Sequence, residues 1–159
     1  NYFSSPKPLD YISLGYNYRI SSMTAALGMS QLAKINKIIE MRQKIAYHYG
    51  KRLDEIDGVA IIKPPKGYKH VYQIYSALFD KRDDIIKHLE KKGISSKIYF
   101  DPVHLTEFYR KSFNFKLGSL PVTESTSKCV LSLPMFPRMT INEVDYVCDV
   151  ISDFYSKNG

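Results

Sequence analysis

The sequence predicts an α+β protein: a small, mainly antiparallel sheet of three to four strands, with helices packed on it and a long helix in front. Only short β-prone segments occur, and helices or loops separate them. Apolar residues recur at helical spacing from Ile35 to Ile56, which is typical of one buried helix face. With 159 residues, 44% of them hydrophobic, the chain is long enough for a compact core.

Two parts are expected along the chain. Residues 1–34 are predicted to form an interface arm and a first helix, and residues 35–159 a small domain that includes the long connecting helix. Proline and aromatic residues in segment 1–14 indicate an irregular arm that packs on something. The chain does not open with Met, so we interpret Asn1 as the start of a fragment, a processed product or an expressed segment.

The first helix is expected over residues 22–34, with Ser21 or Ser22 as its N-cap. Small side chains on this helix would let another backbone approach closely. Asn36 is expected to interrupt the helical pattern. The second helix then runs to about residue 56, and its apolar stripe is interpreted as core.

Short strands and helices alternate after this long helix. Gly58 suits a left-handed C-cap that ends it, and Asp80 can cap a later helix that Gly93 closes. Thr140 and Glu143 have the spacing of a capping box at the start of the last helix. The expected elements are strands 59–62, 70–79 and 94–100, helices 82–92, 105–111 and 121–130, a brief strand 131–133, and the C-terminal helix from 140.

The composition predicts a basic protein without a metal site or a membrane span. Lys and Arg number 23 against 16 Asp and Glu, a net charge of +7 that is spread along the chain. This excess permits nucleic acid, nucleotide or phosphate partners, but solvated surface lysines also account for it.

Cys129 and Cys148 lie among apolar residues and are interpreted as buried free thiols, without the spacing of a metal site. No apolar run approaches a membrane span and no signal peptide is visible, so we expect a soluble cytoplasmic protein.

One polar loop stands directly before the first helix. Within residues 15–22, Asn17 supplies an amide and Arg19 a guanidinium, and the helix N-terminus adds unpaired backbone N–H groups. Such a loop suits an anion, and a phosphate is the natural guest. The alternative interpretation is a capped helix in which Arg19 forms a salt bridge.

The order of motifs along the chain resembles the DegT/StrS family of pyridoxal-phosphate-dependent sugar aminotransferases. The resemblance spans about residues 10 to 155, and its specificity lies in the ordered set of motifs. The motifs are Gly15-Tyr16-Asn17-Tyr18-Arg19, Ala25-Ala26-Leu27-Gly28, Gln31-Leu32, Arg42, His70 to Tyr75, Arg82-Asp83, Gly93-Ile94, Pro102 to Leu105, Leu120 to Glu124, Leu131 to Pro134 and Thr140 to Val144.

The resemblance implies the C-terminal part of a fold-type I enzyme. The family's large domain lies upstream and carries the lysine that forms the Schiff base, so no residue of this chain is assigned a catalytic role. The implied full enzyme is a homodimer that moves an amino group from glutamate or glutamine onto a keto-sugar nucleotide. The 159 residues alone would be inactive, and neither nucleic acid nor membrane is an expected partner.

The resemblance also assigns roles to particular residues. Asn17 would reach across the dimer interface to the phosphate of the partner's pyridoxal phosphate, with Arg19 as a second ligand or a salt-bridge anchor. Tyr99-Phe100 stands where the family commonly has His-Tyr in the substrate pocket, which puts acid/base chemistry there in doubt. Tyr99 and His104 are predicted to bind substrate, although His104 can equally be a loop histidine.

Two further residues, Glu124 and His70, are expected to have structural roles. Glu124, in a first helical turn, is expected to form a cap or an internal salt bridge, and His70 is expected to be structural.

The rival function is a non-catalytic basic module that binds nucleotide or nucleic acid by stacking bases on some of the 13 tyrosines. Those tyrosines are scattered over expected core faces and loops, and no nucleic-acid motif is present.

Overall fold

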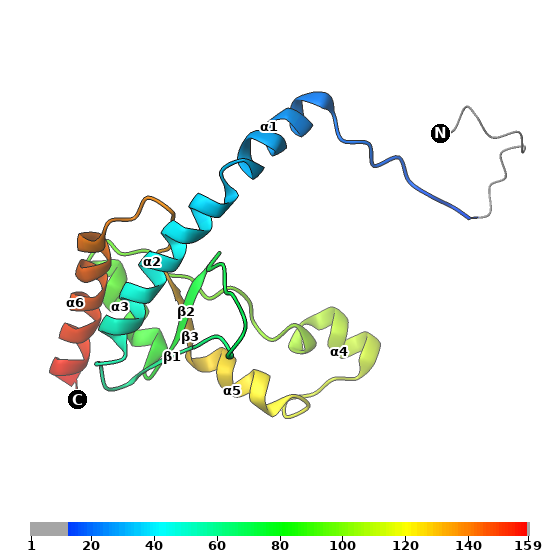
Figure 1. Cartoon of the computed structure of the whole chain (residues 1–159). Helices are drawn as coiled ribbons and strands as arrows, with labels where there is room; N and C mark the ends of the chain where they lie inside the picture. Colours follow the sequence, from blue (N-terminus) through cyan, green and yellow to red (C-terminus); the bar gives the residue numbers. More distant parts are fainter. Residues whose placement is uncertain (1–12, 159) are drawn as a thin grey trace, which may run out of the picture. The chain divides into compact units, whose positions relative to one another are not determined.

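The structure, a computed structural model, describes residues 13–158 (Figure 1). The chain divides into two compact units, residues 1–35 and residues 36–159, and each is described by itself. Most of the predicted arm, residues 1–12, lies outside the described residues.

In the first unit, residues 13–20 form no helix or strand, and helix α1 follows as Ser22–Leu32. Ser21 is its N-cap: the Ser21 hydroxyl accepts a hydrogen bond from the Thr24 backbone N–H over 3.2 Å, as predicted. The break after α1 comes earlier than expected, because Lys34 N bonds to Gln31 O and tightens the last turn. Asn36, expected to interrupt the pattern, lies inside the next helix.

The second unit contains a three-stranded antiparallel sheet in the order β1-β2-β3. Strand β1 (Val59–Ile61) pairs with β2 (Tyr75–Phe79), and β2 pairs with β3 (Val130–Leu133). Burial alternates along β2, which is typical of a strand with one face on the core. The predicted small antiparallel sheet is confirmed.

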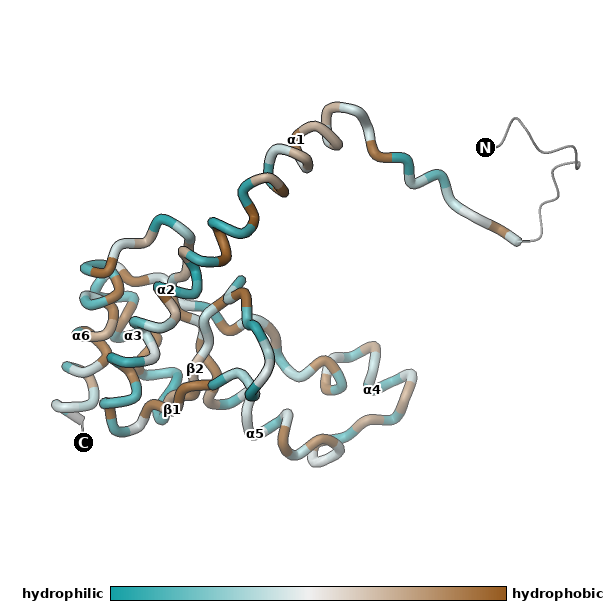
Figure 2. The backbone as a smooth tube through the Cα atoms, in the orientation of Figure 1, coloured by the Kyte–Doolittle hydropathy of each residue, from teal (hydrophilic) through white to brown (hydrophobic). Residues whose placement is uncertain are grey.

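The helices of this unit are α2 (Ile35–Leu53), α3 (Arg82–Lys91), η1 (Val103–Leu105, a short 3₁₀ helix), α4 (Glu107–Phe113), α5 (Pro121–Cys129) and α6 (Ile141–Asn158). Helices α3 and α6 lie side by side (Figure 1). Apolar residues of α2, α3 and α6 form one core with β2 and β3, and Figure 2 shows the alternation of apolar and polar residues along these helices. The fully buried side chains at its centre are Tyr49, Leu53, Phe79, Ile85, Leu89, Leu131, Val144, Cys148 and Ile151.

The start of α6 has the predicted capping box. The Thr140 hydroxyl accepts from Glu143 N over 3.2 Å, and the Glu143 carboxylate accepts from Thr140 N over 2.7 Å. Gly93, at φ +74°, closes α3 as expected. These local signals act within one helical turn, which is why the sequence was sufficient to place them.

The predicted strand over residues 70–79 was too long, because only its second half pairs with neighbouring strands. Tyr72 has φ +48°, which breaks an extended chain. The Arg42 guanidinium donates to the carbonyls of Tyr72 and Gln73 over 2.9 and 2.8 Å. The carbonyls of Tyr72 and Gln73 are therefore satisfied by a side chain of α2 in place of a strand ladder, and Gln43 of α2 donates to the carbonyl of His70 in the same way.

The predicted strand over residues 94–100 was also wrong: Lys97 forms a single antiparallel bridge to Ser132, and no ladder follows. Gly58 has the left-handed φ of +87° but follows a turn after α2 has ended, so it is not the helix C-cap. Asp80 is not the cap of α3, since Lys81 occupies that position with φ +55° and without a side-chain bond to the helix.

The two cysteines differ in burial. Cys148 is fully buried, and burial raises the pKa of its thiol to about 12. Cys129 is only half-buried, which corrects the expectation that both thiols lie in the core. Cys129 is the last residue of α5, at the point where the chain enters β3.

A charged cluster joins α2 to α6 beside this core. His48 Nε2 lies 2.7 Å from Asp145 Oδ1, and Arg52 bonds both Asp145 and Asp149. The hydrogen bond from His48, together with Arg52, holds the pKa of Asp145 below its ordinary value. Ionised Asp145 therefore stabilises the folded chain, and this contribution is lost when pH falls through its lowered pKa.

We expect Asp145→Asn to lower the urea midpoint of unfolding at pH 7. The difference from wild type should shrink below about pH 4, where the unfolded carboxylate also takes up a proton. Glu107→Gln is the control, because Glu107 forms an exposed pair with Lys111. An undiminished difference at pH 3 would show that the charge of Asp145 is not responsible.

Candidate functional site

The loop before α1 exposes two polar side chains, those of Asn17 and Arg19. Asn17 and Arg19 are exposed, and neither side chain has a hydrogen bond or ion pair to another residue between 13 and 158. The Ser21 side chain engages one N–H of the first turn of α1. The salt bridge considered for Arg19 is therefore absent among the described residues.

The phosphate of pyridoxal phosphate, the cofactor that the family resemblance implies, is chemically compatible with this loop. An amide N–H and a guanidinium are donors that suit phosphate oxygens, and the N-terminus of α1 adds the positive end of its dipole. Both side chains are exposed and without partners in the described chain, so they are available to such a ligand. When bound, pyridoxal phosphate supplies the electron sink of a transamination.

The second polar region is a segment that we call the strap, residues 98–103. It follows Lys97, whose backbone N–H and carbonyl bond Ser132 over 3.0 and 2.9 Å. On the strap, Tyr99 is 44% exposed and Phe100 is 83% exposed, and their rings meet edge to face at 6.4 Å. The strap thus holds two aromatic side chains away from the core.

A hollow of about 290 Å³ lies at the start of the strap. Its wall includes Tyr99 together with residues that carry hydroxyl, amide and ammonium groups, which are residue types that suit a sugar. The Ser96 hydroxyl oxygen there is buried without a hydrogen-bond partner among the described residues. The polar residues of the wall are Gln73, Ser95, Ser96, Lys97, Tyr99 and Ser132.

The strap ends at a buried, hydrogen-bonded pair of side chains. His104 and Glu124 are 5% and 8% exposed, and His104 Nε2 lies 2.9 Å from Glu124 Oε1. The same carboxylate accepts the N–H groups of Gly118 and Leu120. The hydrogen bond from His104, with those from the two backbone groups, holds the pKa of Glu124 below its usual range. Because the carboxylate is ionised, His104 Nε2 is the donor.

These contacts combine the two roles expected for Glu124, which accepts the N–H of the α5 N-cap residue Leu120 and also bonds His104. His70 is bound within its own segment, since its Nδ1 accepts from Tyr72 N over 3.0 Å. Substrate binding by Tyr99 and His104 stays a prediction, as does phosphate binding by Asn17 and Arg19. Sequence reasoning missed the anchoring role of Arg42, because its partners lie about 30 residues away in the chain.

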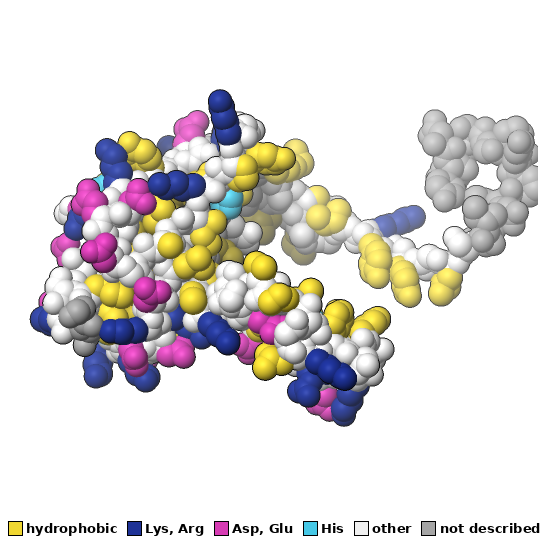
Figure 3. Space-filling view, turned by 90° about the horizontal axis from the view of Figure 1, so that it is seen from below, with side chains coloured by type: hydrophobic (Ala, Val, Ile, Leu, Met, Phe, Trp, Pro, Cys, Tyr) yellow, Lys and Arg dark blue, Asp and Glu magenta, His cyan; other side chains and the backbone are white. Residues whose placement is uncertain are grey.

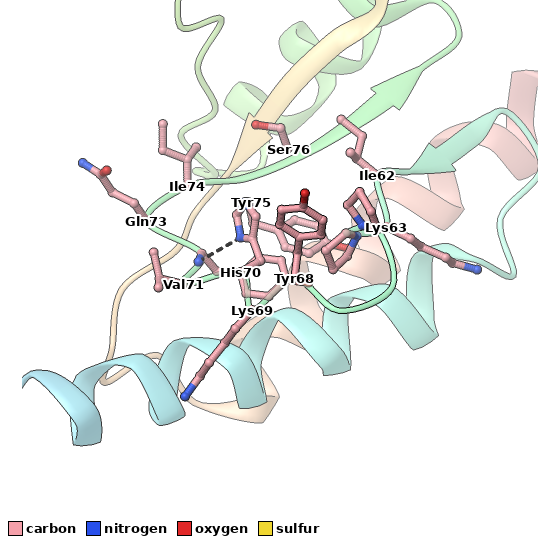
Figure 4. Close-up of a pocket in the computed structure, with 13 residues that line it drawn as sticks. Ile62, Lys63, Tyr68, Lys69, His70, Val71, Gln73, Ile74, Tyr75 and Ser76 are labelled. Carbon is pink, nitrogen blue, oxygen red and sulfur yellow. Dashed lines mark hydrogen bonds between the residues drawn. The ribbon is translucent and has the colours of Figure 1, made fainter.

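Another hollow, of about 610 Å³, lies between the loop after β1 and the segment that precedes β2 (Figure 4). Its wall is mostly apolar and aromatic, with Tyr68, Val71 and Ile74 among its residues. The ammonium groups of Lys63 and Lys69 point away from it in Figure 4. It therefore lacks inward-facing charged groups of the kind that would bind a phosphate.

Large apolar side chains are exposed throughout the described part of the first unit. Leu14, Tyr18 and Met23 are each more than 80% exposed, and Figure 3 shows apolar side chains standing out along this segment. No group of three or more His, Cys, Asp or Glu in residues 13–158 could hold a metal ion. Among the described helices, none has both the length and the apolar character needed to cross a bilayer.

Comparison with known proteins identifies the family. The family model of the DegT/DnrJ/EryC1/StrS aminotransferases matches residues 2–152. The chain belongs to this family. The predicted resemblance is therefore confirmed over nearly the whole chain.

Two relatives are identical to this chain at about a third of the aligned residues. GDP-perosamine synthase of Escherichia coli O157:H7 is 31% identical over 146 residues, which are 90% of this chain and 38% of that protein. A pleiotropic regulatory protein of Geobacillus stearothermophilus is 34% identical over 155 residues, with 96% and 41% covered. The chain thus spans about 40% of the length of such relatives.

Solved structures agree with the fold. A DegT DnrJ EryC1 StrS aminotransferase from Brucella abortus superposes with a TM-score of 0.83 at 32% identity, over 95% of this chain and 40% of that one. S. venezuelae DesV, solved in complex with a ketimine intermediate, gives 0.84 at 27% identity, over 95% and 41%. The described fold is therefore that of part of a DegT-family aminotransferase.

Proposed function

We propose that this chain is the C-terminal portion of a pyridoxal-phosphate-dependent aminotransferase that acts on a keto-sugar nucleotide, with glutamate or glutamine as amino donor. The observation that carries the proposal is the family match over residues 2–152 in a chain that spans about 40% of its relatives. The name of one relative, a GDP-perosamine synthase, supports a sugar-nucleotide substrate.

Within the full enzyme, the chain contributes binding groups and no covalent chemistry. Asn17 donates its amide N–H to the phosphate of the cofactor held by the partner subunit of a homodimer, and Arg19 is a second ligand or an anchor. Tyr99, beside the hollow at the start of the strap, forms part of the sugar wall. The exposed apolar side chains of the first unit support a subunit or domain interface there. The proposed enzyme works in the cytoplasm.

The rival function, a nucleic-acid module, has less support. Binding of bases needs aromatic rings gathered on one face with a basic groove. Among the described residues, the exposed tyrosines are Tyr16, Tyr18, Tyr47, Tyr68, Tyr99, Tyr109 and Tyr146. Apart from Tyr16 and Tyr18, which stack in the loop before α1, they lie on separate elements. Salt-dependent binding of single-stranded oligonucleotides that is lost when exposed tyrosines are replaced would restore the rival.

The phosphate assignment is tested in the full-length enzyme by Asn17→Ala. Removing one hydrogen bond to a charged group costs about 1.5–3 kcal/mol. Cofactor affinity should fall by roughly ten- to a hundredfold at about 1.4 kcal/mol per decade, with the fold unchanged. Asn36→Ala, an exposed amide outside the loop, is the matched control. If only Arg19→Ala weakened binding, the two roles would be reversed, and if neither did, the loop would be only a helix cap.

Mixed dimers test whether Asn17 serves the partner's cofactor. One subunit carries Asn17→Ala, and the other lacks the Schiff-base lysine of the large domain. If Asn17 acts across the interface, each mixed dimer regains one intact site, with its lysine from the first subunit and its Asn17 from the second. Recovered activity supports the proposal, and its absence in verified mixed dimers would place Asn17 in its own subunit's site.

A further inference from the structure

The strap is held at both ends by one continuous stretch of chain. At its start, Lys97 forms two backbone hydrogen bonds with Ser132 of β3. At its end, His104 bonds Glu124 of α5 over 2.9 Å. Helix α5 leads into β3 without an intervening loop. The α5–β3 stretch therefore fixes both ends of the strap.

The two anchors differ in their chemistry. The Lys97 anchor uses backbone groups only, so it does not depend on which side chain occupies the position. The other anchor depends on the side chains of His104 and Glu124, which are the only buried His, Lys, Arg, Asp or Glu among the described residues. A buried carboxylate needs hydrogen-bond donors, and Glu124 receives three: His104 Nε2, Gly118 N and Leu120 N.

The strap between these anchors has little packing of its own. Phe100 is 83% exposed, and Tyr99 is nearly half exposed. Neither side chain belongs to the hydrophobic core, so the anchors decide where both rings stand. Helix α4, which follows His104 and η1, also exposes large apolar side chains, among them Phe108 and Phe113.

We infer that His104 and Glu124 are positioning residues that set the place of Tyr99 against the sugar-nucleotide substrate. The inference rests on the proposed function. It assigns His104 an action through the strap, in place of direct contact with the substrate. The physical reason is geometric: a misplacement of about 1 Å in a binding wall can cost roughly a hundredfold in rate.

The two half-reactions of the full-length enzyme provide the test. In one, the enzyme takes the amino group from the amino donor; in the other, it passes this group to the keto-sugar nucleotide. His104→Phe and Glu124→Gln should both raise the KM for the sugar substrate by roughly ten- to a hundredfold. The donor half-reaction and cofactor affinity should stay within about threefold, since only the sugar wall moves. Glu107→Gln on α4 is the matched control and should change neither.

A conservative variant and an activity-free measurement keep the test decisive. His104→Gln retains an N–H donor and should recover most of the sugar affinity. Glu124→Ala should speed deuterium exchange at the amides of Gly118 and Leu120 by at least about tenfold, because both lose their acceptor. The amide of Gly67, in an exposed loop, is the internal reference.

Three results would overturn the inference. An equal loss in both half-reactions would mean a general structural role. If Glu124→Gln were silent while His104→Gln failed, His104 would contact the substrate directly. If exchange at Gly118 and Leu120 were unchanged in Glu124→Ala, the anchor would not hold the loop. Failure of the proposed function is visible separately, as a wild-type enzyme that aminates no keto-sugar nucleotide although the exchange result is as expected.

Discussion

The 159 residues by themselves are expected to transfer no amino group from any donor to any sugar nucleotide. Transamination with pyridoxal phosphate needs a lysine amine placed to hold the cofactor covalently. The family resemblance places that lysine in the large domain, upstream of these residues. The donors that this chain offers, the Asn17 amide and the Arg19 guanidinium, suit a phosphate and cannot replace an amine nucleophile.

The measurement is a coupled transaminase assay with an absorbance titration of added pyridoxal phosphate. Surface lysines should react slowly and without saturation, and no band of a specifically bound cofactor should form. The full-length protein, assayed under the same conditions, is the control and should be active. Turnover by the 159 residues alone, or saturable binding that Lys97→Ala or another single lysine change abolishes, would contradict the prediction.

Replacing Phe79 by Ala is expected to cost about 3–5 kcal/mol of unfolding free energy, the range for large aromatic side chains in a core. Phe79 is 1% exposed and stands at the end of β2, opposite Val59 of β1. Its removal leaves a cavity between the sheet and the helices of the core. A loss of this size approaches the whole stability of many small domains.

Urea unfolding of the 159-residue chain measures this loss. The midpoint should fall strongly while the slope stays the same, since the surface exposed on unfolding hardly changes. Phe100→Ala is the matched control, because Phe100 is 83% exposed on the strap and its loss should stay within about 0.5 kcal/mol. Similar losses for the two variants would show that burial of Phe79 does not dominate the core.

Local signals in the sequence predicted much of the fold correctly. The capping box of Thr140 and Glu143, the Ser21 cap and the closing Gly93 depend on contacts within a few residues. The stripe of α2 and the alternation in β2 predicted which faces are buried. The ordered motifs also predicted the family, and the match over residues 2–152 confirmed it.

The errors came from segments whose backbone partners are distant in the chain. Residues 70–74 were predicted to be part of a strand, but the Arg42 guanidinium donates hydrogen bonds to two of their backbone carbonyls. Residues 94–100 are similarly rich in apolar and aromatic side chains, yet only Lys97 pairs with the edge strand. A period of two predicts an extended chain, but it does not say whether a neighbouring strand is available along its whole length.

The sequence by itself determined the family, the helices and the polarity of the loop that carries Asn17 and Arg19, because each depends on residue type and short spacing. Only the tertiary structure decided that His104 and Glu124 meet. They are 20 residues apart, and each taken alone is an ordinary loop histidine or a first-turn carboxylate. Their pairing requires the chain between η1 and α5 to turn back on itself, and burial then makes the bond obligatory, since neither group can be solvated there.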